Sequence, residues 1–424
     1  MRRLLVIGQY SDTGFGTVTR ELSIRFLNAG YDVRVIAENH RGDPVKGPLA
    51  GRVWPDEMPG LPFGSGIVTA GMVGVLWEYL DPHDKWKPDA ALIVADVSGL
   101  INRIGDVTPE AVKLWMSIPV YHYCPIEGDN LPPNWRDVWQ MVRPVAMSEY
   151  GQRVISEHLD RPVPMVYHGV DVEHFRPVTF NDPGTFYNPA TKVTTKVMTK
   201  DACKALFGLE GKKVILRADR NATRKFYEKL IEAFVPIAAA EPDAVLLMHC
   251  QGWEPGSVNI YQELQRYPHV AQGGRAWMTG MHDTFRGLDL ESLRCLYNAA
   301  DVYLSPTGGE GFGLCLAESL ACEVPVVVTD WAADKEVVGP GGITVPPLMD
   351  EYGNAVRYHS TYGMDWAVPD ARKFVEPVLR LLAKPSEARA LGKAGRAHVT
   401  KHFNWDTVSA QFVSLFEEAD AVAA

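Results

Sequence analysis

The 424-residue sequence contains no run of about 20 apolar residues, which is the length that a helix needs to span a bilayer. Residues 1–8 resemble the start of a secretory leader, but their apolar run stops at Gln9 and is too short for a leader's core. We therefore expect neither a transmembrane span nor a secretory segment, and we interpret this first run as a buried strand.

The sequence also lacks closely spaced cysteine pairs. None of the six cysteines has a second cysteine at metal-ligand spacing, and several lie in apolar runs, where cysteine behaves as a small hydrophobic residue. We expect no metal site and a reduced, cytoplasmic setting. The cysteines are Cys124, Cys203, Cys250, Cys295, Cys315 and Cys322.

An excess of basic charge is absent as well. Acidic residues number 52 and basic residues 42, giving a formal net charge of −10. Binding to a nucleic-acid backbone usually requires a basic face, so this balance disfavours a nucleic-acid substrate. The hydrophobic share of 46% and the charged share of 22% are ordinary for a globular protein, and the length suggests two or three domains.

What the chain does contain is a regular alternation of short apolar runs and longer amphipathic stretches. Because the runs are continuous, they indicate strands buried on both faces, as in parallel sheets covered by helices. The alternation occurs twice, which predicts an α/β protein with two doubly wound, Rossmann-like domains. The predicted strands are Leu4–Ile7, Val33–Ile36, Ala91–Val94, Leu114–Ile118, Val145–Met147, Val214–Leu216, Ala244–Met248, Val302–Leu304, Pro325–Val328 and Ile343–Val345, and the clearest helices are Thr17–Ala29, Tyr227–Ala240, Leu290–Ala300 and Leu314–Ala321.

A break in this alternation marks the boundary between the two domains. The stretch from Phe175 to Lys200 contains several prolines and no apolar period, which is typical of a linker. We predict a first domain over residues 1–176, a linker or excursion over 177–202, a second domain over 203–402 and a C-terminal helix over 403–424.

The strongest chemical signal follows the predicted strand Val302–Leu304. Its loop, Ser305–Gly311, carries three glycines and leads into a helix. Free backbone N–H groups and a helix start favour a phosphate, and the carboxyl ends of parallel strands are where such folds bind ligands. Two acids frame the loop and helix: Glu318 suits the hydroxyl groups of a ribose, and Glu310 suits those of a sugar.

The nine residues from Glu310 to Glu318 resemble the Glu-x7-Glu motif of retaining glycosyltransferases of family 4, which have the GT-B fold. Further matches follow the family's order over roughly residues 4–416 of this chain. They are Leu293–Pro306, Ala321–Thr329, Glu336–Val338, Met147–Tyr150 and Val166–Asp171. The resemblance implies two Rossmann-like domains that face a central cleft, with the C-terminal helix crossing back toward the first domain.

The resemblance also implies a donor site for a nucleotide diphosphate sugar, without a tightly bound metal. It assigns to Arg220 and Lys225 the basic pair that neutralises the diphosphate when the sugar–phosphate bond breaks, with Arg224 able to share or take over that role. The implied donor-binding residues are Gly14, Gly16, Arg220, Lys225, Glu310, Gly311, Phe312, Gly313, Leu314 and Glu318.

A histidine and three acids in the first half complete the implied site. His122 follows the predicted strand Leu114–Ile118, roughly where the family places a histidine of the catalytic cleft, although its neighbours depart from the family's pattern. A purely structural histidine is an open alternative. The implied catalytic residues are Arg220, Lys225, Glu310 and His122, and the acceptor-side candidates are Asp96, Glu127 and Asp129.

The implied activity is the transfer of a hexose from a nucleotide diphosphate sugar to an acceptor hydroxyl with retained configuration. No cofactor is implied besides this donor substrate, and the acceptor is a carbohydrate, a protein or a lipid-linked molecule, the last compatible with peripheral membrane contact. Two alternatives stay open. One is a catalytically inactive GT-B protein that binds sugar nucleotides, and the other is a glycosyltransferase that acts on modified nucleic acid.

Overall fold

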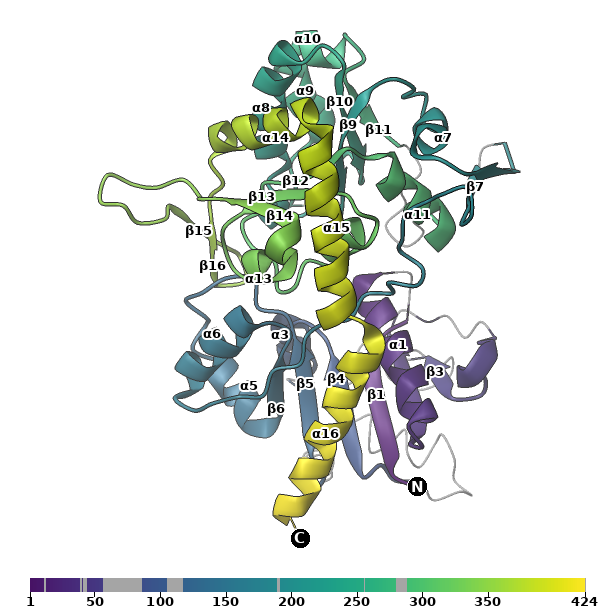
Figure 1. Cartoon of the computed structure of the whole chain (residues 1–424). Helices are drawn as coiled ribbons and strands as arrows, with labels where there is room; N and C mark the ends of the chain where they lie inside the picture. The colour runs from purple at the N-terminus through teal and green to yellow at the C-terminus, as the bar shows by residue number, and fades with distance from the viewer. Residues whose placement is uncertain are drawn as a thin grey trace.

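In the computed structural model, two six-stranded parallel sheets with helices on their faces form two domains, one above the other in Figure 1. The structure describes residues 1–10, 13–38, 40, 44–55, 86–104, 117–188, 191–254, 256–279 and 288–423. Both sheets have the strand order 3-2-1-4-5-6, counted within each domain. This is the doubly wound, Rossmann-like order. The α/β prediction with two such domains is confirmed.

The first sheet has the order β3-β2-β1-β4-β5-β6, and every neighbouring pair is parallel. Residues 4–7 of its central strand are all buried, because helices cover both faces of the sheet. The strands are β1 (Arg3–Gln9), β2 (Asp32–Glu38), β3 (Val53–Pro55), β4 (Ala90–Val94), β5 (Val120–Cys124) and β6 (Arg143–Ala146). The helices described in this domain are α1 (Gly14–Asn28), η1 (Gly47–Leu49), α3 (Val97–Ile104), α5 (Trp135–Met141) and α6 (Glu149–Leu159).

The second sheet repeats this plan as β11-β10-β9-β12-β13-β14, again all parallel. Its strands are β9 (Lys213–Ala218), β10 (Ala244–His249), β11 (Ala276–Met278), β12 (Val302–Ser305), β13 (Val326–Thr329) and β14 (Gly342–Val345). Its helices are α7 (Lys200–Ala205), η2 (Thr223–Lys225), α8 (Tyr227–Ala240), α9 (Ile260–Gln265), α10 (Pro268–Ala271), α11 (Leu290–Ala299), α12 (Leu314–Ala321), α13 (Asp334–Val338), η3 (Gly339–Gly341), η4 (Ala371–Phe374) and α14 (Val375–Ala383).

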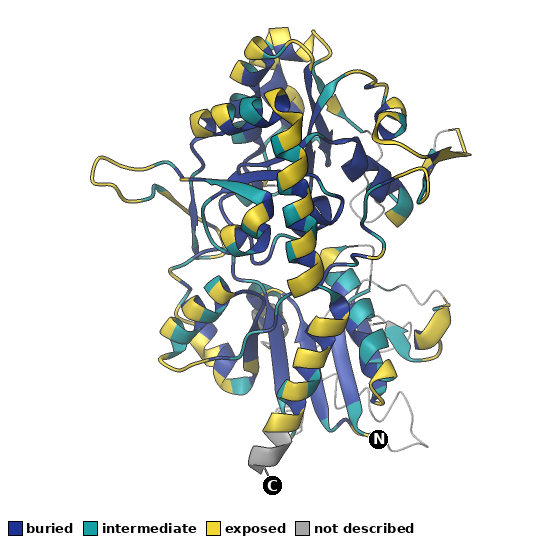
Figure 2. Cartoon of the chain, in the orientation of Figure 1, coloured by how far each residue is buried: buried dark blue, intermediate teal, exposed yellow. Residues whose placement is uncertain are grey.

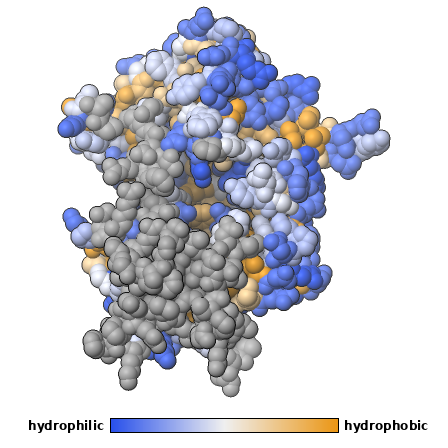
Figure 3. Space-filling view, turned by 180° about the vertical axis from the view of Figure 1, so that it is seen from behind, coloured by the Kyte–Doolittle hydropathy of each residue, from blue (hydrophilic) through white to orange (hydrophobic). Residues whose placement is uncertain are grey.

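Two excursions leave this second domain. One is the hairpin of β7 (Gly184–Asn188) and β8 (Val193–Val197), which packs on α11 and projects at the right of Figure 1. The other precedes the antiparallel pair β15 (Arg357–His359) and β16 (Asp365–Ala367) and projects at the left. Seen from behind, the surface of the second domain is largely hydrophilic with scattered hydrophobic side chains (Figure 3).

The C-terminal helices connect the two domains. Helix α15 (Pro385–His402) packs on α12, and α16 (Trp405–Ala423) continues down the first domain against α1 (Figure 1). Phe412 and Phe416 of α16 are buried against the rings of Tyr123 and Tyr121, at centroid distances of 4.9 and 5.0 Å. The predicted crossing of the C-terminal helix back to the first domain is therefore present. Both α15 and α16 show a row of exposed residues in Figure 2, on the side away from the dark-blue sheets.

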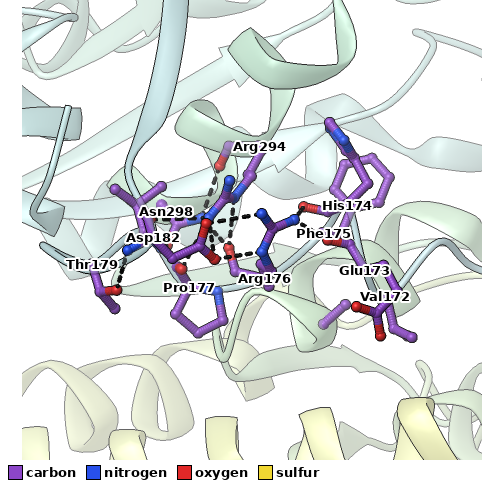
Figure 4. A network of polar contacts seen from close by, with 12 residues as sticks. Val172, Glu173, His174, Phe175, Arg176, Pro177, Thr179, Asp182, Arg294 and Asn298 are labelled. Carbon is purple, nitrogen blue, oxygen red and sulfur yellow. Dashed lines mark hydrogen bonds and ion pairs between the residues drawn. The ribbon is translucent and has the colours of Figure 1, made fainter. Parts of the chain in front are cut away.

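The chain between the domains is fixed to α11 by a polar network (Figure 4). The Arg294 side chain is 1% exposed and donates to the carbonyl oxygens of Arg176 and Pro177, each at 3.1 Å. The Asp182 carboxylate accepts from the guanidinium of Arg176 and forms an ion pair with that of Arg294. Asn298 donates to Arg176 O at 3.0 Å and accepts from the backbone N–H of Val178. The proline-rich segment is thereby anchored to the second domain.

Two expected element boundaries differ from the structure. Within the predicted strand Leu114–Ile118, residues 114–116 lie outside the described part, and Ile118 is in a turn. The strand here is β5, Val120–Cys124, which begins directly after Pro119 and contains the β-favouring residues Val120, Tyr121 and Tyr123. The helix expected over Thr17–Ala29 begins earlier, at Gly14, because the Thr13 hydroxyl caps its first turn.

The carboxyl edges of the two sheets face each other. A Cβ atom placed on Gly311, after β12, would lie 2.2 Å from Pro125 Cβ, after β5. A Cβ on Gly309 would lie 2.2 Å from the carbonyl oxygen of Glu127. The loops of the two domains therefore touch where glycine allows close approach. Among the described residues, no helix is long and apolar enough to cross a membrane.

Candidate active site

Two loops at the carboxyl edge of the second sheet carry six of the ten predicted donor-binding residues. Residues 219–226 follow β9, and residues 306–313 follow β12 and lead into α12. Strands β9 and β12 are neighbours, and the strand order reverses between them. This reversal is where Rossmann-like sheets leave a crevice for ligands. The glycine-rich segment thus lies where its sequence pattern placed it.

Glu310 is at the centre of this site. Its side chain is 5% exposed, and its two carboxylate oxygens meet two different cations. Lys225 Nζ donates to Oε1 at 2.6 Å, and Arg224 donates to Oε2 at 2.6 Å. The hydroxyl of Thr307 adds a hydrogen bond to Oε1 at 3.0 Å. Burial opposes ionisation of Glu310, but Arg224 and Lys225 outweigh it and hold its pKa well below the ordinary value.

The basic residues around Glu310 are not the pair that the resemblance named first. Arg220 is 70% exposed, and its Nε donates to Glu254 at 2.7 Å instead of approaching Glu310. Arg224 and Lys225 both belong to the 3₁₀ turn η2 and point to the same carboxylate. The sequence left open that Arg224 shares the role of Arg220, and the geometry favours that alternative.

The residues between the two glutamates form the start of α12. Gly313 caps the helix with a φ of +89°, a left-handed conformation that favours glycine. Phe312 is 3% exposed, and its ring stacks on His168 of the interdomain connection at 5.0 Å. Leu314 is the nearest neighbour of Gly14 in the first domain, at 3.7 Å from a Cβ placed there. This segment therefore joins the site to the domain interface.

Glu318 lies one helical turn farther along α12 and is 7% exposed. The Tyr297 hydroxyl donates to its Oε2 at 2.6 Å. Burial raises the pKa of Glu318 to about 7, while the hydrogen bond from Tyr297 opposes the shift. Glu310 is thus held ionised by two cations, whereas Glu318 has an apolar environment and one hydroxyl partner.

The predicted glycines of the first domain lie in the first turn of α1. The backbone N–H of Gly16 donates to the Thr13 hydroxyl at 3.2 Å, and this hydrogen bond caps the helix. A Cβ atom placed on Gly14 would lie at an ordinary contact distance from Leu314 of the second domain. The structure therefore places Gly14 at the interface with α12 and gives Gly16 a capping role within its own helix.

Two of the three acidic candidates from the first domain contact the second domain. Glu127 forms an ion pair with Arg224 at 3.2 Å. Burial, together with Asp96 and Glu310, raises the pKa of Glu127 to about 7 against the opposing charge of Arg224. Asp129 pairs with β16 through its backbone and forms an ion pair with Arg357. Asp96 is exposed at the start of α3, close enough to affect Glu127.

His122 does not reach the interface between the domains. It lies within β5 and is 0% exposed. Its Nε2 is 3.0 Å from Ala95 O, and Trp139 donates to its Nδ1 at 3.2 Å. The expectation that it follows a strand was wrong, because the strand is Val120–Cys124. The geometry favours the structural alternative over the catalytic one.

The sequence reading missed three polar residues of this region. Arg217 is 0% exposed in β9 and pairs with Asp219 at 2.9 Å. Glu336 accepts from the backbone N–H groups of Glu149 and Tyr150 across the interface, at 2.8 and 3.0 Å. Asp334 is buried beside Glu310. A single charged residue in an apolar run does not indicate which residues it will contact. Of these three, only Glu336 could have been predicted as a site residue, because it belongs to a segment that resembles the family.

In the ranges that the structure describes, no three His, Cys, Asp or Glu side chains are grouped so that they could hold a metal ion. The cations at the site are instead side chains of the protein itself. Arg217, Arg224 and Lys225 all contribute positive charge around Glu310. The site is therefore suited to an anionic ligand that is held by lysine, arginine and backbone N–H groups.

Comparison with solved structures places this fold in the GT-B class. A sucrose-phosphate synthase from Thermosynechococcus elongatus matches with a TM-score of 0.67 and 18% identity, over 100% of both chains. A structure of Anabaena HepE in complex with UDP and glucose matches with a TM-score of 0.64 and 13% identity, over 99% of this chain and 100% of the other. Both similarities concern the fold.

Residues 212–361 match the family described as glycosyl transferases group 1. The match covers about a third of the chain and lies within the second domain, around the candidate site. A GDP-mannose-dependent monoacylated alpha-(1-6)-phosphatidylinositol monomannoside mannosyltransferase of Corynebacterium glutamicum is 27% identical over 279 residues, 64% of this chain and 58% of the relative. Two further relatives are matched over 29% and 44% of their own lengths.

Proposed function

We propose that this protein transfers a hexose from a nucleotide diphosphate sugar to an acceptor hydroxyl and retains the anomeric configuration. The observation that carries the proposal is the cluster of Glu310, Lys225 and Arg224 at the strand-order reversal of the second sheet. A cationic cluster beside a glycine-rich loop is suited to a diphosphate, and the buried acids are suited to the alcohol groups beside it.

The donor would lie along the loop of residues 306–313. Lys225 and Arg224 would move part of their charge from Glu310 to the diphosphate, and Arg220 is exposed enough to join them from Glu254. Glu318 would bind the ribose hydroxyls. The name of the GDP-mannose-dependent relative and the HepE structure in complex with UDP-glucose support GDP-mannose and UDP-glucose as the first donors to test.

For the chemistry, we infer a front-face substitution. Both oxygens of Glu310 are engaged in ion pairs, which makes it a poor nucleophile toward the anomeric carbon. The bond from the anomeric carbon to the phosphate oxygen breaks while the acceptor oxygen bonds to the same face. The acceptor proton passes to the departing phosphate, so that the products are the glycoside and a nucleoside diphosphate. The protein contributes positioning and positive charge.

The test is incubation of the purified protein with a panel of nucleotide sugars, with and without carbohydrate, protein and lipid acceptors. We expect nucleoside diphosphate release with one or a few donors and a product whose anomeric configuration equals that of the donor by NMR. Lys225→Met is expected to lower nucleoside diphosphate affinity roughly tenfold or more in calorimetry, because a charge-assisted contact is lost.

Three outcomes would speak against parts of this proposal. Uptake of no nucleotide sugar by calorimetry would refute the donor site. Binding without release under any acceptor condition would support an inactive sugar-nucleotide-binding protein. An inverted product would refute the front-face mechanism while leaving the donor site intact.

A further inference from the structure

Asp334 is a fully buried acid without a protein partner in the described part of the chain. It begins the short helix α13 and is 0% exposed. Neither Oδ1 nor Oδ2 accepts a hydrogen bond from a described residue. Buried polar groups are ordinarily paired, because an unpaired carboxylate in an apolar environment is unfavourable. Asp334 is therefore expected to have a purpose other than holding the fold together.

A second, partly buried acid shows the usual situation. The carboxylate of Asp301 meets Lys200 at 2.9 Å and Lys204 at 2.8 Å, and it accepts from the backbone N–H of Val214 at 2.8 Å. Its pKa is lowered because these cations outweigh the effect of burial. The chain thus supplies full compensation for an acid that is structural. Among the described residues it supplies no hydrogen-bond partner for the carboxylate of Asp334.

Asp334 is adjacent to the proposed donor site. The preceding residue, Ala333, donates its backbone N–H to Glu310 O at 3.2 Å. Burial and the negative charge of Glu310 raise the pKa of Asp334 well above its ordinary value, while Lys225 and Arg224 oppose the shift. The loops that follow β12 and β13 therefore bring two acids together, one paired with cations and one unpaired.

Two other polar atoms near Asp334 are also buried without a partner among the described residues, namely Trp331 Nε1 and the Tyr150 hydroxyl. The indole of Trp331 lies at the interface, where its Cδ1 would be 3.2 Å from a Cβ on Gly309. Tyr150 comes from the first domain, and its pKa is raised by burial and then by nearby acids that include Asp334.

The three groups differ in their hydrogen-bonding character. The Asp334 carboxylate accepts hydrogen bonds, the Trp331 indole donates one, and the Tyr150 hydroxyl can do both. The guanidinium of Arg357 lies over the Trp331 ring at 4.9 Å and keeps its indole in place. Hydrogen-bond acceptors and donors in a water-poor site are what the hydroxyl groups of a pyranose require.

We propose that Asp334, with Trp331 and Tyr150, forms a hexose subsite beside Glu310 that binds hydroxyl groups of the transferred sugar and selects a complete hexose over a deoxyhexose. The inference rests on the proposed function. It assigns the subsite to the donor because Asp334 and Glu310 belong to the same domain and are joined through Ala333. A site built to pair with a hydroxyl rejects the analogue without it, because its own buried group then stays unpaired.

The first test compares Asp334→Ala and Asp334→Asn with the wild type. The donors are the accepted nucleotide hexose and its single deoxy and fluoro analogues, with the nucleotide kept constant. We expect Asp334→Ala to lower kcat/KM for the complete hexose by about tenfold to a hundredfold, the loss of a hydrogen bond to a charged group. The wild type is expected to discriminate strongly against at least one deoxy analogue, and the variant is expected to lose that discrimination. Affinity for the free nucleoside diphosphate is expected to stay within about twofold, because the subsite contacts the sugar.

The second test measures the unfolding midpoint of the ligand-free protein. Asp334→Asn is expected to raise it, because an uncompensated buried acid is removed. The matched control is Asp301→Asn, which removes a fully paired acid and is expected to lower it. If Asp334 only supported the fold, Asp334→Asn would lower the unfolding midpoint, as Asp301→Asn is expected to do.

Failure of this inference and failure of the proposed function give different results. If the wild type releases nucleoside diphosphate but Asp334→Ala has the same rate and the same preference among deoxy donors, the subsite is refuted and the proposed function stands. An increase in the acceptor's KM alone would also overturn the assignment to the donor. If the wild type uses no nucleotide sugar, both proposals fall.

Discussion

Closure of the two domains depends on the absence of a side chain at Gly311. A Cβ atom at this position would lie 2.2 Å from Pro125 Cβ, 2.8 Å from Pro125 Cα and 3.0 Å from Ile126 N, all in the first domain. Carbon atoms in contact are normally about 3.5–4.0 Å apart. Gly311→Ala therefore forces the loops apart, and its backbone φ is not in the left-handed region, so the effect is one of space alone.

The cost of such overpacking is typically about 1–3 kcal/mol. Because closure excludes water and brings the acceptor to the donor, we expect this energy to appear in turnover, as a roughly 5- to 150-fold lower kcat/KM. Small-angle X-ray scattering of the ligand-free variant is expected to show a larger radius of gyration. Calorimetry is expected to show little change in affinity for the nucleoside diphosphate, since the clash involves the other domain.

The control is Gly14→Ala, which adds the same methyl group on the facing side of the interface. Its Cβ would lie 3.7 Å from Leu314, an ordinary contact distance, so its scattering profile is expected to match the wild type. An unchanged profile for Gly311→Ala with unchanged turnover would refute the steric reasoning. A loss of nucleotide affinity proportional to the loss of rate would show that Gly311 acts through the donor and not through closure.

Further predictions concern burial and the connection between the domains. Glu318 has a raised pKa, so the folded state is most stable where this acid is protonated and loses about 3 kcal/mol as pH rises from about 4.5 through about 7. In urea unfolding of the ligand-free protein between about pH 5 and pH 8, Glu318→Gln is expected to lack this loss, and parallel curves would contradict the shift. His122→Ala is expected to cost about 2–4 kcal/mol of stability by leaving a cavity beside Trp139, with nucleotide affinity unchanged. A loss of turnover without a loss of stability would restore a catalytic role for His122. Arg294→Met leaves the carbonyl oxygens of the linker without a donor and is expected to make residues 176–182 susceptible to limited proteolysis, whereas an unchanged digestion pattern would show that the network of Figure 4 does not hold the linker.

The second domain was easier to predict than the first. Helices α8 and α12 begin and end at the predicted residues, because each combines an amphipathic stretch with a clear boundary. In the first domain, β5 was displaced from the expected Leu114–Ile118 to Val120–Cys124. A short apolar run does not specify whether it is a strand, so length and neighbouring residues have to decide. The hairpin of β7 and β8 was missed because its strands are polar and lie in the proline-rich segment.

For the candidate site as well, some features could be predicted from the sequence and others could not. Glu310, Glu318, the glycines and the basic loop were found from local pattern and family resemblance, whereas Asp334 was not. Their pairing was not, because a hydrogen bond between Lys225 and Glu310 joins residues 85 positions apart in the chain. The cations that lower the pKa of Glu310 and the burial that raises the pKa of Glu318 likewise come from their surroundings.

Apolar runs and glycine positions along the chain were sufficient to establish two doubly wound domains and the loop that follows β12. Those features are local, since a strand and the start of a helix are specified by neighbouring residues. Folding in three dimensions settled which cation faces Glu310. The turn η2 ends at Phe226 with a φ of +46° and turns Arg224 and Lys225 toward the acid, while Arg220 points to Glu254. It also buried Asp334 without a hydrogen-bond partner in the part of the chain that the structure describes, because burial and charge compensation depend on segments that meet only after the sheets have formed.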